Sequence, residues 1–298
     1  MKKIILSLLL LVASSSAMAE LNIFACEPEW AALSHELGGD KVTVFSATTG
    51  LQDPHYIQAR PSLIAKARRT HLLVCTGAEL ESGWLPLLQR KAGNAAIQTG
   101  AGGYFMASDY VALLDIPSSL DRSQGDVHAA GNPHVHTSPV TILNIAKALT
   151  QRMQQLDGNN TVYYQQRWHD FKQRWQASTE RWQQQAAPLK GVNIVIQHNS
   201  WPYLLSWLEL NKVAVLERKA GVAPTLDDLN NVLNQLKITP AKMVIHAAYQ
   251  SPRATDWLVD KTGINKVTLP FTVGGNEQSK DLFSLFDDTI KRLLEASE

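Results

Sequence analysis

The sequence predicts an α/β protein of two lobes, each a parallel sheet flanked by helices, joined by one long interlobe helix. Short apolar strands alternate with helical segments before residue 159, and the same alternation restarts after residue 187. The 29 residues between them contain no Gly or Pro. Short apolar strands that alternate with helices are typical of parallel sheets covered on both faces. We expect a signal peptide at 1–19, an N-terminal lobe at 20–158, the interlobe helix at 159–187 and a C-terminal lobe at 188–298.

The first 19 residues have the pattern of a signal peptide that is removed on export. Two lysines precede a short apolar run, and Ala17-Met18-Ala19 has the A-x-A form of a cleavage site. The apolar run is too short to remain as a membrane-spanning helix. A lipid anchor would need a cysteine directly after this run, and Cys26 lies too far downstream. We therefore expect a soluble periplasmic protein that begins at Glu20.

In the N-terminal lobe, strands and helices should alternate along the chain. We expect strands at 21–26, 41–47, 71–75 and 95–99, and helices at 29–37, 61–70 and 85–91. An irregular region at 100–139 should follow. Ser138 is placed as an N-cap and Pro139 as the first residue of a helix that runs through Met153.

The segment at 159–187 predicts one amphipathic helix. Its apolar stripe recurs at steps of four and three residues: Tyr164, Trp168, Phe171, Trp175, Ser178 and Trp182. A helix of this length would extend about 43 Å, which is longer than most small domains are wide. A coiled-coil segment is the alternative, but the stripe covers only about three heptads and lacks Leu or Ile at its seam. We therefore interpret the segment as a strut between the two lobes.

In the C-terminal lobe the alternation of strands and helices repeats. We expect strands at 192–196, 212–216, 243–247 and 266–269, and helices at 201–210, 225–236, from Ser251-Pro252 to near Gly263, and at 281–295. Thr225 and Asp228 have the spacing of a capping box at the start of the second helix.

Charge and cysteine content limit the partners and the compartment. The net charge is +1 and no block of Lys or Arg occurs, so neither nucleic acid nor a membrane surface is indicated as a partner. Cys26 and Cys75 are the only cysteines, and both end apolar runs. If those runs are adjacent parallel strands, the cysteines could form a disulfide in an oxidising compartment. Two buried free thiols are the alternative.

Three of the nine histidines lie in loops that could reach a cleft between the lobes. His55 and His198 follow predicted strands, and His134 precedes a predicted helix. Ligands of open α/β sheets bind beyond the carboxyl ends of the strands. Neutral imidazoles suit zinc, whereas manganese more readily takes carboxylates. No H-x-x-x-H or CxxC spacing identifies a metal site independently.

The other histidines are weaker candidates. His35, His71 and His169 lie within helix or strand patterns, so we interpret them as structural or solvent-facing. The roles of His128 and His136, which flank His134, stay open. His246 ends a strand and could face the cleft.

Three segments resemble a known family. QDPHYIQARPSLIAKARRTHLLVCTGAELESGWL, GNPHVHTSP and NIVIQHNSWPYL are similar, in this order, to stretches of the zinc- and manganese-binding solute-binding proteins of ABC importers. That cluster includes the periplasmic zinc-uptake proteins, and a long helix between two lobes is its hallmark. The resemblance implies that His55, His134 and His198 are metal ligands. In this family a histidine at the third position accompanies zinc and a glutamate accompanies manganese, so His198 favours Zn²⁺ as the transported ligand.

The chain departs from the family pattern at two places. Pro270 stands where many members supply an aspartate as fourth ligand, so water, His128, Glu27 or His246 could fill that position. The histidine-rich loop of many zinc-binding members is reduced here to DVHAAGNPHVH. A second, scavenging metal site should therefore be weak or absent.

The resemblance predicts a monomeric, non-catalytic zinc-binding protein that delivers its ion to an ABC permease. It would meet the membrane only through that permease. A zinc-dependent hydrolase is one alternative, because three histidines and a bound water are also a hydrolytic arrangement. The sequence has no H-E-x-x-H motif and no evident general base to support it. A metal-binding surface adhesin is the second alternative.

Overall fold

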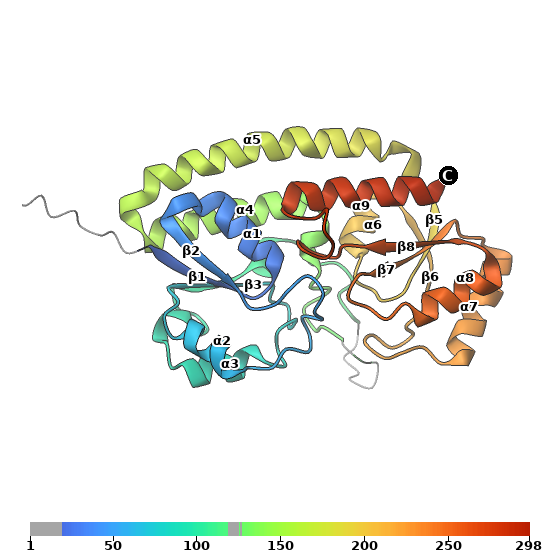
Figure 1. The fold of residues 1–298 in the computed structure, drawn as a ribbon, viewed down its shortest axis with the longest axis horizontal. Helices are drawn as coiled ribbons and strands as arrows, with labels where there is room; N and C mark the ends of the chain where they lie inside the picture. Colours follow the sequence, from blue (N-terminus) through green and yellow to red (C-terminus); the bar gives the residue numbers. More distant parts are fainter. Residues whose placement is uncertain (1–19, 119–124, 126) are drawn as a thin grey trace, which may run out of the picture.

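The computed structural model describes residues 20–118, 125 and 127–298. Within them, two four-stranded parallel sheets have the orders β2-β1-β3-β4 and β6-β5-β7-β8. Each sheet forms the centre of one lobe, and a long helix arches over both (Figure 1). The predicted fold class is confirmed. The predicted signal peptide lies outside the described residues, and none of the helices within them is both long and apolar enough to cross a lipid bilayer.

The N-terminal sheet is covered by helices on both faces. Its strands are β1 (Leu21–Ala25), β2 (Val42–Ser46), β3 (Leu72–Cys75) and β4 (Tyr104–Met106), and its helices are α1 (Pro28–Gly38), α2 (Pro61–Ala67), α3 (Leu85–Ala92) and α4 (Pro139–Leu156). Alternate residues of β1 face opposite sides of the sheet. Ile23 packs in the apolar cluster that includes α1 and α4, and Phe24 packs in the cluster that includes α2 and α3. Both faces are thus apolar, as expected for a parallel sheet.

The C-terminal sheet repeats this arrangement. Its strands are β5 (Asn193–Ile196), β6 (Asn211–Val215), β7 (Met243–Ala247) and β8 (Asn265–Leu269), and its helices are α6 (Pro202–Leu208), α7 (Leu226–Ile238), α8 (Arg253–Thr262) and α9 (Leu282–Ser297). Helices α6 and α9 cover one face, and α7 and α8 the other. The predicted capping box at the start of α7 is confirmed, because Thr225 and Asp228 exchange side-chain to backbone hydrogen bonds.

One predicted strand is wrong. Residues 95–97 form a short 3-10 helix, Ala95–Ile97, because the Asn94 side chain accepts a hydrogen bond from the Ala96 N–H and turns the chain. The fourth strand, β4, instead lies inside the region that we expected to be irregular. Gly103 permits this pairing, since a Cβ there would lie 2.2 Å from the His71 carbonyl oxygen.

Helix α5 (Thr161–Gln185) joins the lobes as predicted. It packs on α1 and α4 of the N-terminal lobe and on α9 of the C-terminal lobe (Figure 1). Four residues of its stripe are fully buried, namely Tyr164, Phe171, Trp175 and Trp182, whereas Trp168 and Ser178 are half-buried. The Trp175 indole N–H donates to the Pro139 carbonyl at 2.8 Å, and that of Trp182 donates to Asp287 at 2.6 Å. The strut is therefore fixed to both lobes.

One apolar core runs through both lobes beneath α5. A single cluster of buried side chains includes Ile23 and Leu72 from the N-terminal sheet, Trp175 from α5, and Ile194 and Ile245 from the C-terminal sheet. The clusters on the outer faces, under α2–α3 and α7–α8, each belong to one lobe only. The two lobes thus share one inner core beneath α5, and each lobe has a separate outer core under its own pair of helices.

Cys26 and Cys75 form a disulfide. They lie at the ends of the neighbouring parallel strands β1 and β3, and their Cα atoms are 4.8 Å apart. Both residues are fully buried. The predicted pairing is confirmed.

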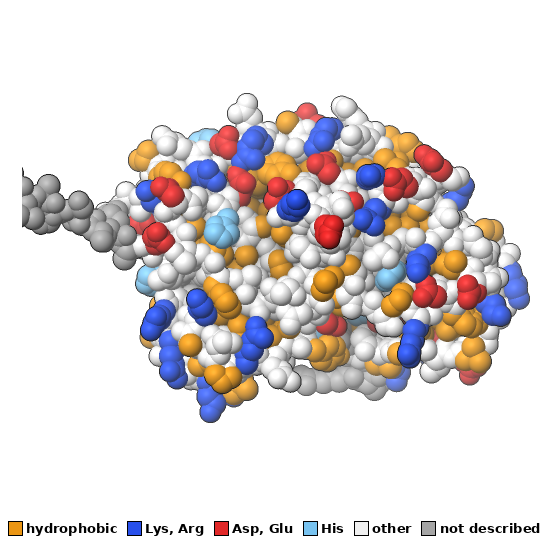
Figure 2. All heavy atoms as spheres, in the orientation of Figure 1, with side chains coloured by type: hydrophobic (Ala, Val, Ile, Leu, Met, Phe, Trp, Pro, Cys, Tyr) orange, Lys and Arg blue, Asp and Glu red, His pale blue; other side chains and the backbone are white. Residues whose placement is uncertain are grey.

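Charges of both signs are scattered over much of the surface in Figure 2, with Lys and Arg side chains gathered over α2 and α3. Most of the described ion pairs lie on the surface, where such pairs contribute little to stability. We therefore attribute the stability of the fold mainly to its apolar clusters and its disulfide.

Candidate metal centre

The three predicted histidines come together between the lobes. His55 lies in the loop after β2, His198 follows β5, and His134 precedes the short 3-10 helix Val135–Thr137 that leads into α4. The ring centroids of His55 and His134 are 5.7 Å apart, and His198 lies 6.1 Å from each of them. The loops of both lobes thus present their imidazoles to one place.

Two of these rings are oriented by carboxylates. The Nδ1 atom of His55 lies 2.8 Å from Asp53 Oδ1, and that of His198 lies 2.7 Å from Glu217 Oε2. An Nδ1–H that donates to a carboxylate leaves Nε2 unprotonated and free to bind a metal. Although burial raises it, the hydrogen bond from His55 leaves the pKa of Asp53 below its ordinary value, so Asp53 is ionised at neutral pH. Both carboxylates are therefore placed to favour, in a neutral ring, the tautomer that a metal ligand requires.

His134 is the most deeply buried of the three. Its side chain is 1% exposed, and burial together with the neighbouring His55 and His198 lowers its pKa well below the ordinary value. Its backbone N–H donates to Asn132 Oδ1 at 3.0 Å, and its carbonyl accepts from Thr137 Oγ1 at 2.9 Å. His134 is thus a neutral imidazole on a rigidly held loop.

Of the residues considered for the fourth position, the structure brings His128 to the other rings. Its Nε2 lies 3.3 Å from His55 Nε2. Two nitrogens bound to one tetrahedral zinc at about 2.0–2.1 Å would lie about 3.3 Å apart. His246 instead forms a hydrogen bond with Thr268 at 2.7 Å, and Glu27 is engaged with Glu81 behind the disulfide.

The centre has an open geometry. Among the described residues, only Cys26, Cys75 and Glu81 offer three candidate ligand atoms that all lie within 4.8 Å of one another, and both sulfurs are in the disulfide. No three histidine nitrogens of the described chain lie that close together. The rings must therefore turn, or their loops move inward, to surround an ion.

Comparison with known proteins identifies the family. The model of ZnuA, described as the periplasmic component A of a zinc-uptake complex, matches residues 23–296. The chain belongs to the ZnuA family.

Solved structures share this fold, and curated relatives match part of the sequence. A crystal structure of ZnuA superposes with a TM-score of 0.78 at 18% identity, covering 94% of this chain and 100% of that one. A mutant of the laminin-binding adhesin Lmb from Streptococcus agalactiae gives 0.74 at 18% identity, over 93% and 100%. PsaA from Streptococcus pneumoniae, a manganese ABC transporter substrate-binding lipoprotein, is 26% identical over 172 residues. That match covers 56% of this chain and 53% of PsaA, so the chain spans about half the length of such curated relatives.

The sequence motifs of this member of the ZnuA family did not point to the carboxylates that contact His55 and His198. Glu217 lies two residues beyond β6, and Asp53 lies two residues before His55. The rule that placed His198 at the carboxyl end of a strand applies equally to Glu217, so its position was an available signal. The spacing of Asp53 and His55 was also an available signal, because a carboxylate two residues before a histidine in a loop can reach its imidazole.

We expect Glu217→Gln to weaken metal binding about tenfold, at the lower end of the ten- to hundredfold loss that typically follows removal of such a supporting carboxylate. The amide can still accept a hydrogen bond but no longer stabilises the bound imidazole by charge. Calorimetric titration with Zn²⁺ would measure the change. Glu209→Gln is the matched control, since Glu209 pairs with Lys190 on the surface. Equal affinities for the two variants would remove Glu217 from the site.

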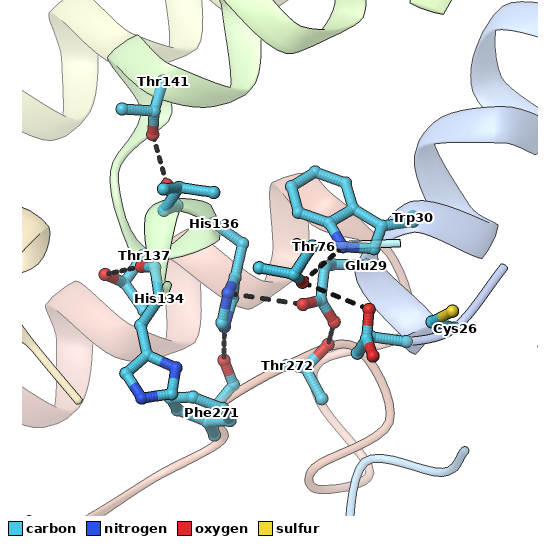
Figure 3. A network of polar contacts seen from close by, with 12 residues as sticks. Cys26, Glu29, Trp30, Thr76, His134, His136, Thr137, Thr141, Phe271 and Thr272 are labelled. Carbon is cyan, nitrogen blue, oxygen red and sulfur yellow. Dashed lines mark hydrogen bonds and ion pairs between the residues drawn. The ribbon is translucent and has the colours of Figure 1, made fainter. Parts of the chain in front are cut away.

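His136 has a structural role behind the centre (Figure 3). Its Nε2 lies 3.1 Å from the Phe271 carbonyl oxygen, and its Nδ1 lies 3.3 Å from Glu29 Oε1. Glu29 on α1 also accepts a hydrogen bond from the Thr272 hydroxyl. The Phe271 ring packs against His134, with centroids 5.3 Å apart. This buried network joins the two lobes and supports the wall behind His134, so His136 is not a candidate ligand.

A second buried acidic group lies beside the disulfide. Glu81 accepts hydrogen bonds from the N–H groups of Thr76 at 2.7 Å and Gly77 at 3.0 Å. Burial and the charge of Glu81 raise the pKa of Glu27 well above its ordinary value, and burial raises that of Glu81 to about 7. The backbone N–H groups of Thr76 and Gly77 stabilise a negative charge on Glu81. Glu27 is therefore the protonated member of the pair, and its carboxyl O–H donates a hydrogen bond to Glu81.

This acid pair should make folding pH-dependent. Both carboxyls ionise near pH 4.5 when unfolded, whereas in the folded chain the pKa of Glu81 rises to about 7 and that of Glu27 rises well above its ordinary value. Stability should therefore fall as pH rises from about 4.5 through 7, and the shift of Glu81 alone corresponds to about 3 kcal/mol. Glu27→Gln replaces the protonated acid with a neutral donor. We expect this variant to melt at a higher temperature at pH 7.5 and to show a smaller pH dependence. If the melting temperatures of the variant and the wild type changed by the same amount between pH 5 and 8, the proposed proton between Glu27 and Glu81 would be excluded.

Proposed function

We propose that the chain is the metal-capturing component of an ABC importer, and that it binds one Zn²⁺ ion with His55, His134, His198 and His128. The observation that carries this proposal is the gathering of His55, His134 and His198 between the lobes, with the Nδ1 atoms of His55 and His198 held by carboxylates. Membership of a family of uptake components, not of enzymes, argues against the hydrolase alternative.

Zinc is proposed over manganese because of the chemistry of the ligand set. The gathered side chains offer neutral nitrogen, which zinc favours, whereas manganese is better matched by carboxylates and water. The two nearby carboxylates, Asp53 and Glu217, are engaged with the Nδ1 atoms of His55 and His198. The relative PsaA carries manganese in its name, so metal selectivity within this group is an experimental question.

Delivery would follow from small movements of the site. We propose export to the periplasm after removal of residues 1–19, action as a monomer, and transfer of the ion to a membrane permease. Because α5 is packed on both lobes, wide hinge opening is disfavoured. Capture and release would then depend on the loops that carry the histidines.

Native mass spectrometry of the mature chain with equal concentrations of Zn²⁺ and Mn²⁺ tests the function and the selectivity together. The expected result is one zinc ion per chain and little manganese. A preference for manganese would overturn the assignment of zinc, and binding of neither metal would overturn the proposed function.

A further inference from the structure

A cavity of about 590 Å³ opens directly beside the histidines. It lies at the carboxyl ends of β5, β6 and β7, where open α/β sheets bind their ligands, and His55 and His198 form part of its wall. One water occupies about 30 Å³ in the liquid. A metal ion with a few waters would therefore fill only a small part of this space. Cavities of about 300–1,000 Å³ are typical of sites for small organic molecules.

The cavity wall contains a buried acceptor without a partner. Gln197 lines the cavity next to His198 and is only 5% exposed. Its Nε2 is directed to Glu217 Oε1 at 3.5 Å, whereas its Oε1 has no hydrogen-bond partner. A buried carbonyl oxygen in this situation normally has a donor, because leaving it unpaired costs about 1–3 kcal/mol. Gln197 is thus suited to accept from an N–H or O–H group of a molecule in the cavity.

The wall also carries one cationic side chain, the exposed Arg253, in addition to the carboxylates Asp53 and Glu217. Arg253 is the first residue of α8, and its guanidinium has no hydrogen bond or ion pair with any described residue. Helix α8 begins at the cavity without a side-chain cap, and Asp256 of its first turn is paired with Lys266, so the first N–H groups of the helix can attract an anion there. Tyr249 and Trp257 supply aromatic walls. Arginine is the side chain best suited to bind a carboxylate through two parallel hydrogen bonds.

We propose that the site takes its metal together with a small α-amino carboxylate chelator, which occupies this cavity. The inference rests on the proposed function and specifies the form of its cargo. The amine of the chelator binds the ion and donates an N–H to Gln197 Oε1, and its carboxylate pairs with Arg253. The chelator therefore adds a donor to the ion from the side of the cavity, whose wall includes His55 and His198.

The test compares L-histidine with histamine, which keeps the imidazole and the amine but lacks the carboxylate. Native mass spectrometry and calorimetry would follow their binding to the zinc-loaded mature chain. We expect a ternary species of protein, zinc and one histidine, formed at least tenfold more tightly than with histamine. Arg253→Gln should abolish this preference without changing the affinity for zinc alone. Arg90→Gln, at an exposed position on α3, should behave as the wild type.

The outcomes separate this proposal from the proposed function. If the wild type binds zinc alone but forms no ternary species, or binds histidine and histamine equally tightly, the chelator proposal is wrong and the zinc site stands. If histidine keeps its advantage in Arg253→Gln, the assigned role of Arg253 is overturned. Absence of zinc binding in the zinc-only titration would instead overturn the proposed function.

Discussion

Substitution of His55, His134 or His198 by alanine is expected to weaken zinc binding at least tenfold, which corresponds to about 1.4 kcal/mol. Each substitution removes one neutral nitrogen from the site. His198→Ala also leaves the buried Glu217 carboxylate without its imidazole partner. Calorimetry with a competing chelator would measure the three affinities separately.

The controls for this experiment lie on the same chain. His169→Ala should bind zinc as the wild type does, because His169 is exposed on α5 and contacts Gln165. His128→Ala tests the fourth position, and a loss similar to that of His55→Ala would support His128 as a ligand. Any variant of the first three that retained full affinity would exclude that histidine from the site.

Replacement of both Cys26 and Cys75 by alanine is expected to lower the free energy of unfolding by about 4 kcal/mol. The disulfide closes a loop with a sequence separation of 49 residues. In the chain-entropy model, a loop of that size restricts the unfolded chain by about this amount. Urea unfolding of the oxidised wild type and the double variant, both without metal, would measure the difference in midpoint. Coincident unfolding curves would show that the disulfide does not contribute to stability, and reduction of the wild type offers an independent comparison.

The sequence predicts most of the fold because its local signals agree with the tertiary structure. The apolar strands alternate with capped helices, and Thr225 and Pro139 begin their helices where expected. The prediction of a strand at 95–99 fails because the Asn94 side chain competes for the backbone N–H of Ala96. The strand β4 is only three residues long, and its pairing depends on the close approach of Gly103 to β3, which no local pattern displays.

The candidate site is predictable only in part, because side-chain directions and contacts between distant residues do not appear in any local pattern. Position beyond strand ends identifies His55 and His198, since parallel strands bring their carboxyl ends to one edge. Selection of His128 over His246 depends on side-chain direction, and His246 turns to Thr268 of the neighbouring strand. The contact between Glu29 and Thr272 joins residues 243 positions apart, so it exists only after the lobes are packed together.

The shared core beneath α5 limits how this architecture can be rearranged. Either lobe on its own would expose the apolar side chains that now meet Trp175 and the opposite sheet. Exchange of whole lobes between two family members would place mismatched surfaces in one closely packed interior, where changes of volume are poorly tolerated. The outer faces, under α2–α3 and α7–α8, carry no such constraint because each is confined to its own lobe. New partners or specificities can thus be acquired at the outer faces and loops, whereas the inner core must change as a unit.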